Sequence, residues 1–145
     1  MVVENRRARY EYHIMESLEA GVVLNGSEVK SIRGGGASLT EAYARFRDGE
    51  AWLMGMHIPP YKQGSFSNSE PNRPRKLLLH KEEIARLQSR VGEKGLTVVP
   101  LRLYFTRGIA KVLLGVARGK KLWDKRADAA KRDVEREIAA HVRRA

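Results

Sequence analysis

The segment Lys111-Val-Leu-Leu-Gly-Val-Ala117 decides the fold, because an apolar run of this length is typical of a single buried strand. The pattern ends at Arg118, and charged residues prevail from there to Ala145. This last segment has ten Lys or Arg against five Asp or Glu, a local net charge of +5, and it contains the large aromatic Trp123. A folded body that runs directly into a cationic arm is therefore predicted. The alternative is a solvated terminus without function.

The whole chain is strongly basic, with a formal net charge of +11 and a pI of about 10.3. Such a charge favours nucleic acid or an anionic membrane as the partner. A membrane is the weaker candidate, because no apolar run approaches the roughly 20 residues that span a bilayer and the N-terminal segment lacks a signal-peptide core. The chain has no cysteine, which excludes disulfides and thiolate metal sites. We expect a cytoplasmic protein that binds nucleic acid.

The first third of the chain predicts a strand and a short helix. Residues 10–24 alternate between apolar and polar, which predicts one long strand bent near Ser17 or Gly21. Ser27 is the candidate cap of a short helix. That helix is expected to end at the glycines 34–36.

The middle of the chain predicts a hairpin, a loop and a second helix. Asp-Gly at 48–49 separates two alternating runs, 42–46 and 50–56, and this is a strong hairpin signal. The proline-rich segment 59–76 predicts an exposed loop. Ile84, Leu87 and Val91 form the apolar stripe of a helix over residues 81–91.

Two more strands complete the body. Residues 97–105 alternate, with a bulge or edge position expected at Pro100, and residues 111–117 follow. The sequence thus predicts a mainly β fold with short helices: a closed antiparallel barrel of the oligonucleotide-binding type with flanking helices. Residues 1–119 would form this barrel domain. Residues 120–145 would form a basic tail with an apolar stripe too thin to dock, disordered alone and helical on a partner.

Catalytic and metal-binding patterns are not found in the sequence. The four histidines are scattered and show no zinc-ligand spacing. The glycines 34–36 could hold a phosphate, but a flexible turn is the more common use of such a run. A carboxylate cluster of Glu28, Glu41 and Glu50 would suit a nuclease, yet these residues fall at expected caps and turns. We expect no enzyme activity, no cofactor and no metal.

Binding chemistry is better represented. Lys and Arg neutralise phosphates, and aromatic rings stack on unpaired bases. Tyr10 follows the basic run 5–9, and Trp123 lies between Lys120-Lys121 and Lys125-Arg126. The opposing interpretation of Tyr10 is that its ring simply lines the barrel. For Trp123 stacking on RNA is favoured.

Several motifs, in order and at matching spacing, carry a resemblance to a known family. They are Asn5-Arg-Arg-Ala-Arg9, Leu18-Glu-Ala-Gly21, Gly26-Ser-Glu-Val-Lys-Ser-Ile-Arg33, Arg75-Lys-Leu-Leu-Leu-His-Lys81, Leu96-Thr-Val-Val-Pro-Leu101, Lys111-Val112 and Gly115-Val-Ala-Arg-Gly-Lys-Lys-Leu-Trp-Asp-Lys-Arg126. Together they resemble the small protein B family, the partner of transfer-messenger RNA in bacterial trans-translation. The resemblance extends from Asn5 to about Glu137.

The resemblance implies an adaptor that binds the tRNA-like domain of transfer-messenger RNA and delivers it to stalled ribosomes. The family's RNA-facing surface and the basic residues beside it would include Asn5, Arg6, Arg7, Tyr10, Glu19, Leu78, His80, Lys111, Arg118, Lys120 and Lys121. The tail would enter the decoding centre of 16S rRNA and the empty messenger channel through Trp123, Asp124, Lys125, Arg126, Lys131 and Arg132. The protein would act as a monomer.

Two other functions remain open from the residues themselves. One is a small basic nuclease or RNA-modifying factor on a similar barrel, which would gather acids or histidines on one face. The other is a general single-strand-binding barrel, which would need no ordered role for the tail.

Overall fold

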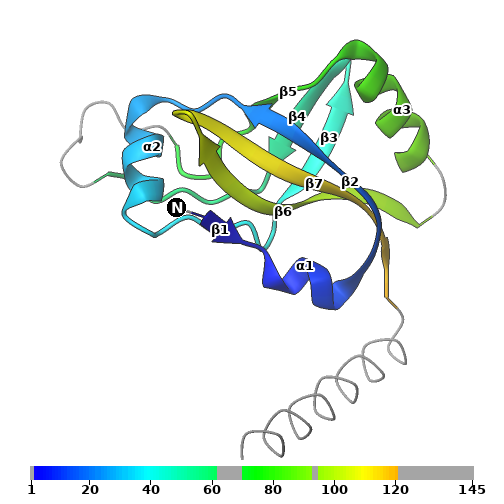
Figure 1. Cartoon of the computed structure of the whole chain (residues 1–145), viewed down its shortest axis with the longest axis horizontal. Helices are drawn as coiled ribbons and strands as arrows, with labels where there is room; N and C mark the ends of the chain where they lie inside the picture. Colours follow the sequence, from blue (N-terminus) through cyan, green and yellow to red (C-terminus); the bar gives the residue numbers. More distant parts are fainter. Residues whose placement is uncertain (1, 62–69, 93–94, 121–145) are drawn as a thin grey trace, which may run out of the picture.

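The computed structural model describes residues 2–61, 70–92 and 95–120. Within these ranges the chain forms seven strands and three helices around one curled sheet (Figure 1). In chain order these are β1 Val2–Glu4, α1 Arg6–Glu11, β2 Tyr12–Val22, α2 Gly26–Arg33, β3 Tyr43–Arg47, β4 Glu50–Met54, β5 Arg75–Leu78, α3 Lys81–Val91, β6 Leu96–Thr106 and β7 Ile109–Gly119. The sheet order is β1-β6-β7-β2-β5-β4-β3, and every neighbouring pair is antiparallel.

Two tight hairpins set the register of the sheet. The β3–β4 turn has positive φ at both Asp48 (52°) and Gly49 (75°), as a two-residue hairpin turn requires, so the hairpin expected from Asp-Gly is confirmed. The β6–β7 turn repeats this geometry at Arg107 (φ 52°) and Gly108 (φ 77°). The register of the second hairpin shifts between Pro100 and Arg102, which confirms the bulge predicted at the proline.

The closed barrel predicted from the sequence is wrong, because the sheet is open. Its ends are β1 and β3, and no hydrogen-bonded ladder joins β3 to another end strand in the described residues. The sheet nevertheless curls so far that β3 lies beside β6, and α3 packs against β4, β6 and β7. The result is a half-wrapped sheet around a core, with two edges that remain unpaired with each other.

Asn5, which follows β1, is hydrogen-bonded to the edge of β6. Its backbone N–H donates to Leu101 O (2.9 Å), and its Nδ2 donates to Pro100 O (2.8 Å) and to Leu39 O (3.1 Å). These bonds occupy the β6 carbonyls that a closing strand would need, and β1 takes the rest of that edge through Val2–Glu4. Pro100 also lacks an N–H, so a ladder could not pass through this point unbroken.

Two apolar cores lie on opposite faces of the sheet. The main core is inside the curl and includes Ile32, Leu53, Leu77, Leu103 and Val112, all nearly inaccessible to solvent. A second, smaller core lies on the outer face under α1. It consists of Ala8, Val99, Leu101 and Ala117, with Tyr12, Ile14 and Leu113 packed around them. Helix α1 therefore covers part of the outer face.

The N-terminal segment differs from the expected strand. Residues 6–11 form α1, so Tyr10 lies on a helix and the strand starts at Tyr12. Asn5 caps this helix, because its Oδ1 accepts a hydrogen bond from Ala8 N (3.2 Å). The irregularity in β2 falls between Ile14 and Glu16, earlier than the bend expected near Ser17 or Gly21.

Two further boundaries differ from expectation. Asn25, not Ser27, caps α2: Asn25 Oδ1 accepts from Glu28 N (3.0 Å), and Glu28 Oε1 accepts from Asn25 N (3.1 Å), a capping box. Residues 75–78, expected as the end of a loop and an entry to a helix, form the strand β5 between β2 and β4. The helix expected over residues 81–91 is confirmed as α3.

A buried ion-pair network fastens α2 to β5. Glu28 Oε2 accepts from Arg75 Nε (2.8 Å) and Arg73 Nε (3.1 Å), and the Arg75 guanidinium also donates to Met56 O (2.5 Å) and Pro71 O (3.0 Å). Burial opposes ionisation of Glu28, but the hydrogen bonds from Arg73, the Asn25 backbone and Arg75 outweigh it and lower the pKa of this carboxyl. Burial lowers the pKa of Arg75, and Glu28 opposes that shift. The network is therefore an ionised pair held inside the fold.

The helices in the described residues include none long and apolar enough to cross a bilayer. The tail predicted over residues 120–145 lies outside the described residues apart from Lys120. Its conformation, and the division into a body and a tail, stay predictions.

Candidate nucleic-acid interface

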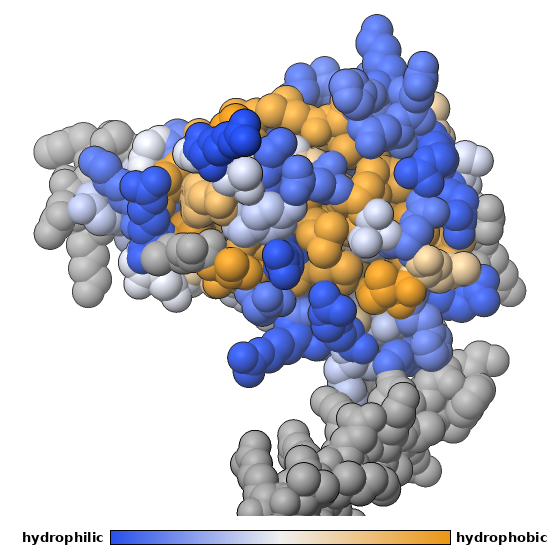
Figure 2. All heavy atoms as spheres, viewed as in Figure 1, coloured by the Kyte–Doolittle hydropathy of each residue, from blue (hydrophilic) through white to orange (hydrophobic). Residues whose placement is uncertain are grey.

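A row of side chains crosses the outer face of the sheet beyond the part that α1 covers. The register places Tyr104 of β6 beside Lys111 of β7. Lys111 in turn lies beside Gly21 of β2, and Gly21 lies beside Leu78 of β5. Val112 next to Lys111 is fully buried, so the alternation of β7 turns Lys111 away from the core. Figure 2 shows apolar and charged side chains interspersed on the face over β6, β7 and β2.

Gly21 lets Leu78 lie across the sheet. A Cβ at position 21 would be 3.2 Å from both Cβ and Cδ1 of Leu78, closer than an ordinary van der Waals contact. With glycine there, the Leu78 side chain occupies that space, yet 54% of its surface remains exposed. An apolar side chain held in place but open to solvent can contact the face of a base or a ribose.

Glu19 links the charged and aromatic members of this surface. Its Oε1 lies 3.7 Å from Lys111 Nζ, and its Oε2 accepts a hydrogen bond from the Tyr104 hydroxyl. Desolvation, and then the hydrogen bond to Glu19, raise the pKa of Tyr104, which keeps this phenol protonated as a donor. The Arg102 guanidinium carbon lies 5.1 Å from the centroid of the Tyr104 ring. We call Glu19, Leu78, Tyr104 and Lys111 the outer-face surface.

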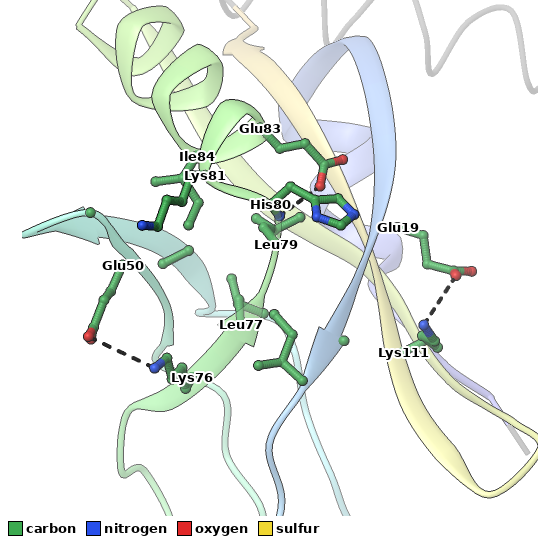
Figure 3. A pocket seen from close by; sticks show the side chains of 14 residues that line it. Glu19, Glu50, Lys76, Leu77, Leu79, His80, Lys81, Glu83, Ile84 and Lys111 are labelled. Carbon is green, nitrogen blue, oxygen red and sulfur yellow. Dashed lines mark hydrogen bonds and ion pairs between the residues drawn. The ribbon is translucent and has the colours of Figure 1, made fainter.

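The outer-face surface continues into a hollow between β5 and the start of α3 (Figure 3). The Glu19–Lys111 pair borders one side, and Lys76 with Glu50 (3.9 Å) borders the other. His80 lies at the N-terminus of α3, where its backbone N–H donates to Glu83 Oε1 (3.0 Å). The hollow thus presents both positive and negative groups around apolar walls.

The structure brings together four of the residues expected to face RNA. Glu19, Leu78, His80 and Lys111 all line this single hollow although they come from β2, β5, α3 and β7. Tyr104 was missed by the sequence reasoning. The alternation of Leu103 and Phe105 toward the core would have placed it on the outer face.

A second group of the expected residues gathers around α1. Arg6 and Tyr10 are exposed on this helix. Arg7 forms ion pairs with Glu11 (2.8 Å) and Glu41 (2.7 Å), and the hydrogen bond and negative charge of Glu11 raise the pKa of Arg7. Its charge is therefore already balanced by acids of the same chain.

The end of β7 returns to α1. Lys120 N donates to Glu11 O (2.7 Å), and Arg118 is exposed and pairs across the ladder with His13. Residue 120 therefore leaves the body beside α1, as the end of the coloured trace shows in Figure 1. Lys121, Trp123, Asp124, Lys125, Arg126, Lys131 and Arg132 lie outside the described residues, and their roles stay predictions.

Asn5, which was expected to face RNA, is buried in the structure. Its side chain is 3% exposed, and the hydrogen bonds to Ala8, Leu39 and Pro100 engage both the amide oxygen and the amide nitrogen. A direct contact between this side chain and RNA stays an untested prediction. In the structure Asn5 acts as a brace between α1 and β6.

The three acids considered for a nuclease have separate partners. Glu28 is buried with Arg75, Glu41 pairs with Arg7, and Glu50 pairs with Lys76. Within the described ranges no three of the His, Asp or Glu side chains are placed to hold a metal ion. The outer-face surface instead offers a cation, hydrogen-bond acceptors and exposed apolar area, the groups that contact phosphate, ribose and bases.

A curled, open antiparallel sheet with such a surface, in a chain of net charge +11, defines a small basic β protein of the nucleic-acid-binding class. Comparison with known proteins is more specific. The family model described as SmpB protein matches residues 2–144. The chain belongs to the SmpB family.

Individual relatives agree with this assignment. The SsrA-binding protein of Desulforudis audaxviator is 58% identical, over 98% of this chain and 93% of its own. That of Carboxydothermus hydrogenoformans is 55% identical, over 99% and 96%. A solved chain from the structure titled "tmRNA-SmpB: a journey to the center of the bacterial ribosome" is 57% identical, covers 83% of this chain and 85% of its own, and superposes with a TM-score of 0.72.

Proposed function

We propose that this protein binds the tRNA-like domain of transfer-messenger RNA, the SsrA RNA, and delivers it to ribosomes stalled without a stop codon. The observation that carries the proposal is the outer-face surface, in a chain that shares more than half its residues with SsrA-binding proteins over nearly its whole length. The likeness to a chain from a tmRNA–SmpB structure gives further support. The partners are that RNA and the ribosome.

The outer-face surface supplies complementary contacts to RNA. Lys111 neutralises a phosphate, and Leu78 packs against a sugar or a base face. Glu19 accepts hydrogen bonds, for which base amino groups and ribose hydroxyls are donors. Glu19 Oε1 and Lys111 Nζ lie 3.7 Å apart, so an RNA group can replace either side chain as the partner of the other. Contacts of this kind hold a folded RNA by its shape and its backbone.

The protein acts as a binding adaptor and performs no catalytic step of its own. It works in the cytoplasm, where ribosomes translate. The basic tail, with Trp123 and the motif Asp124-Lys125-Arg126, contacts the decoding centre and the empty messenger channel. Its root at Lys120 lies beside α1, so this end of the body would face the small ribosomal subunit.

RNA recovered from cells tests the proposal. The tagged protein is purified from its own cells after crosslinking, and the bound RNA is sequenced. One tRNA-like species should dominate, and it should be depleted when Lys111→Glu protein is used. A control variant, Arg33→Glu, reverses an exposed charge on α2 that is not a member of the outer-face surface and lies over the Phe105 ring, and it should keep the enrichment. A diffuse spread of RNAs with the intact protein would contradict the proposal.

A further inference from the structure

The outer faces of β3, β4 and β5 form another arrangement of cations around an aromatic ring. The ladders place Arg45 beside Trp52 and Trp52 beside Lys76, so the indole lies between two basic side chains in one cross-strand row. The alternate residues Ala51 and Leu53 on β4 are completely buried, which puts Trp52 on the face away from the core. We call Arg45, Trp52 and Lys76 the tryptophan row.

The side chains of the tryptophan row are accessible. Arg45 and Lys76 are exposed, and Trp52 is partly exposed between them. Tyr43, one row further along β3, is 45% exposed and lies opposite Met54. A sheet face with a tryptophan, a tyrosine and flanking cations therefore faces outward at this edge of the molecule.

Charges on this face are arranged asymmetrically. Near the hairpin turn, Lys76 lies 3.9 Å from Glu50, and Arg47 lies 3.7 Å from Asp48, so these cations have acidic neighbours. Among the described residues, no acidic side chain is within ion-pair distance of the Arg45 guanidinium. The Arg45 end of the row is the one best suited to an incoming anion.

The tryptophan row is continuous with the outer-face surface. Lys76 and Leu78 are alternate residues of β5 and both point outward, and both line the hollow of Figure 3. A chain bound at Leu78 can therefore reach Trp52 by passing along β5 to Lys76 and then crossing to β4, about 5 Å away. Beyond Trp52 it meets Arg45 on the edge strand β3, which in the described residues is hydrogen-bonded to a strand on one side only.

We propose that the tryptophan row binds an unpaired segment of the RNA that the outer-face surface holds. Trp52 stacks on one base of this segment, and Arg45 and Lys76 contact the phosphates on either side. Single-stranded RNA is recognised by aromatic rings on sheet faces flanked by basic side chains, because every base has a face that stacks and every linkage carries a charge. This inference rests on the proposed function in one respect: it takes the bound RNA to be transfer-messenger RNA.

An RNA occupant suits the row better than a protein segment does. The ring is flanked by cations on both neighbouring strands, whereas a site for an apolar peptide would surround it with apolar side chains. The whole chain carries a net charge of +11, which attracts a polyanion to the tryptophan row as well as to the outer-face surface.

The first experiment follows Trp52 itself. The chain has two tryptophans, so the Trp123→Phe variant of the full-length protein reports on Trp52 alone. Addition of a single-stranded 12-nucleotide oligo(U) should quench its fluorescence, and a 12-base-pair RNA duplex should quench it much less. Unchanged emission with saturating oligo(U) would overturn the proposal.

The second experiment measures affinity for oligo(U) and for full-length transfer-messenger RNA. Trp52→Ala should weaken oligo(U) binding about 5- to 150-fold, the equivalent of one stacking interaction, whereas Trp52→Phe should retain most of the affinity. Arg45→Ala should weaken binding of both RNAs more than the matched control Arg33→Ala, which removes an equal exposed charge from α2. Trp52→Phe and Arg45→Ala keep the test valid if Trp52→Ala fails to fold.

The outcomes separate this proposal from the proposed function. If Lys111→Glu weakens binding of transfer-messenger RNA but the Trp52 and Arg45 variants match Arg33→Ala, the tryptophan row is not an RNA site and the function stands. If the intact protein does not select transfer-messenger RNA, yet Trp52 is quenched by oligo(U), the row binds RNA and the proposed function fails.

Discussion

Lys111 carries the positive charge at the centre of the outer-face surface, where Glu19 is its nearest acid. We predict that Lys111→Glu weakens binding of transfer-messenger RNA, because it removes a phosphate contact and places two carboxylates side by side. The fold should persist, since Lys111 is outside the core. Affinity measured across a salt series should show the largest loss at low salt and a smaller salt dependence, by about one phosphate contact. Unchanged affinity at low salt would exclude Lys111 as a contact.

Glu28 should make stability depend on acid pH. Its pKa is lowered in the folded protein, so its ionised form stabilises the fold at pH values above its unfolded pKa, and this stability is lost as pH falls through the folded pKa. Glu28→Gln should unfold at lower temperature than the parent at pH 7, and the difference should shrink below about pH 4.5, the ordinary value for this carboxyl. Thermal melts of both proteins from pH 7 to pH 3 measure it. A difference that stays constant to pH 3 would show that the Glu28 charge is not what stabilises the network.

Among the elements, the β6–β7 hairpin supplies six of the 19 buried residues of the main core. Leu103 and Val112 are cross-strand partners and are both almost fully buried. Leu103→Ala and Val112→Ala should each lower the free energy of unfolding by ~1–5 kcal/mol, through lost burial and the cavity left behind. Urea unfolding measures the loss, and Thr106→Ala at the exposed end of β6 is the control. A midpoint equal to that of the parent for either core variant would be incompatible with this packing.

Local patterns predicted elements well where the signal itself is local. Asp48-Gly49 determines its own turn, and the apolar stripe of α3 repeats within one helix, so both were found. Helix α1 was missed because its capping residue and its apolar contacts depend on β6 and β7, about one hundred residues later. The strand β5 was missed because only four residues pair, between a proline-rich segment and a helix.

The open sheet and the candidate site also depend on contacts between distant residues, which local sequence patterns do not predict. The sheet ends at β1, and Asn5, which follows it, donates to Pro100 O and Leu101 O of β6; no periodicity in the sequence reveals such bonds. The candidate site was placed by a family resemblance, which named Glu19, Leu78 and Lys111, and the structure then showed that they meet. Tyr104 needed the cross-strand register, since only pairing with Lys111 puts it on the same row.

At the scale of the whole molecule, the body and the tail should be separable. Truncation after Lys120 keeps both cores, the outer-face surface and the hydrogen bond from Lys120 to Glu11. The shortened protein should melt within a few degrees of the full chain and retain its RNA affinity within about tenfold, because it loses eight basic and five acidic residues, a net charge of +3. It should fail to support tagging of nascent chains on messages without a stop codon.

A milder variant narrows that result to one side chain. Trp123→Ala in the full chain should reduce tagging by an amount equivalent to one stacking interaction of ~1–3 kcal/mol. Its affinity for free transfer-messenger RNA should not change. Full tagging by the truncated protein would show that residues 121–145 have no role on the ribosome.

The hydrogen bonds of Asn5 also bear on the order in which parts of the protein fold. Its acceptor at Pro100 lies 95 residues downstream, and β1 pairs with residues 102–104. During synthesis the N-terminal residues emerge first, but their binding places do not exist until β6 has left the ribosome. The β6–β7 hairpin forms from neighbouring residues, so it closes quickly once it emerges. Packing of α1 against β6 instead requires closure of a long loop, which is slower. Residues 2–11 are thus synthesised before β6 but become native only after it.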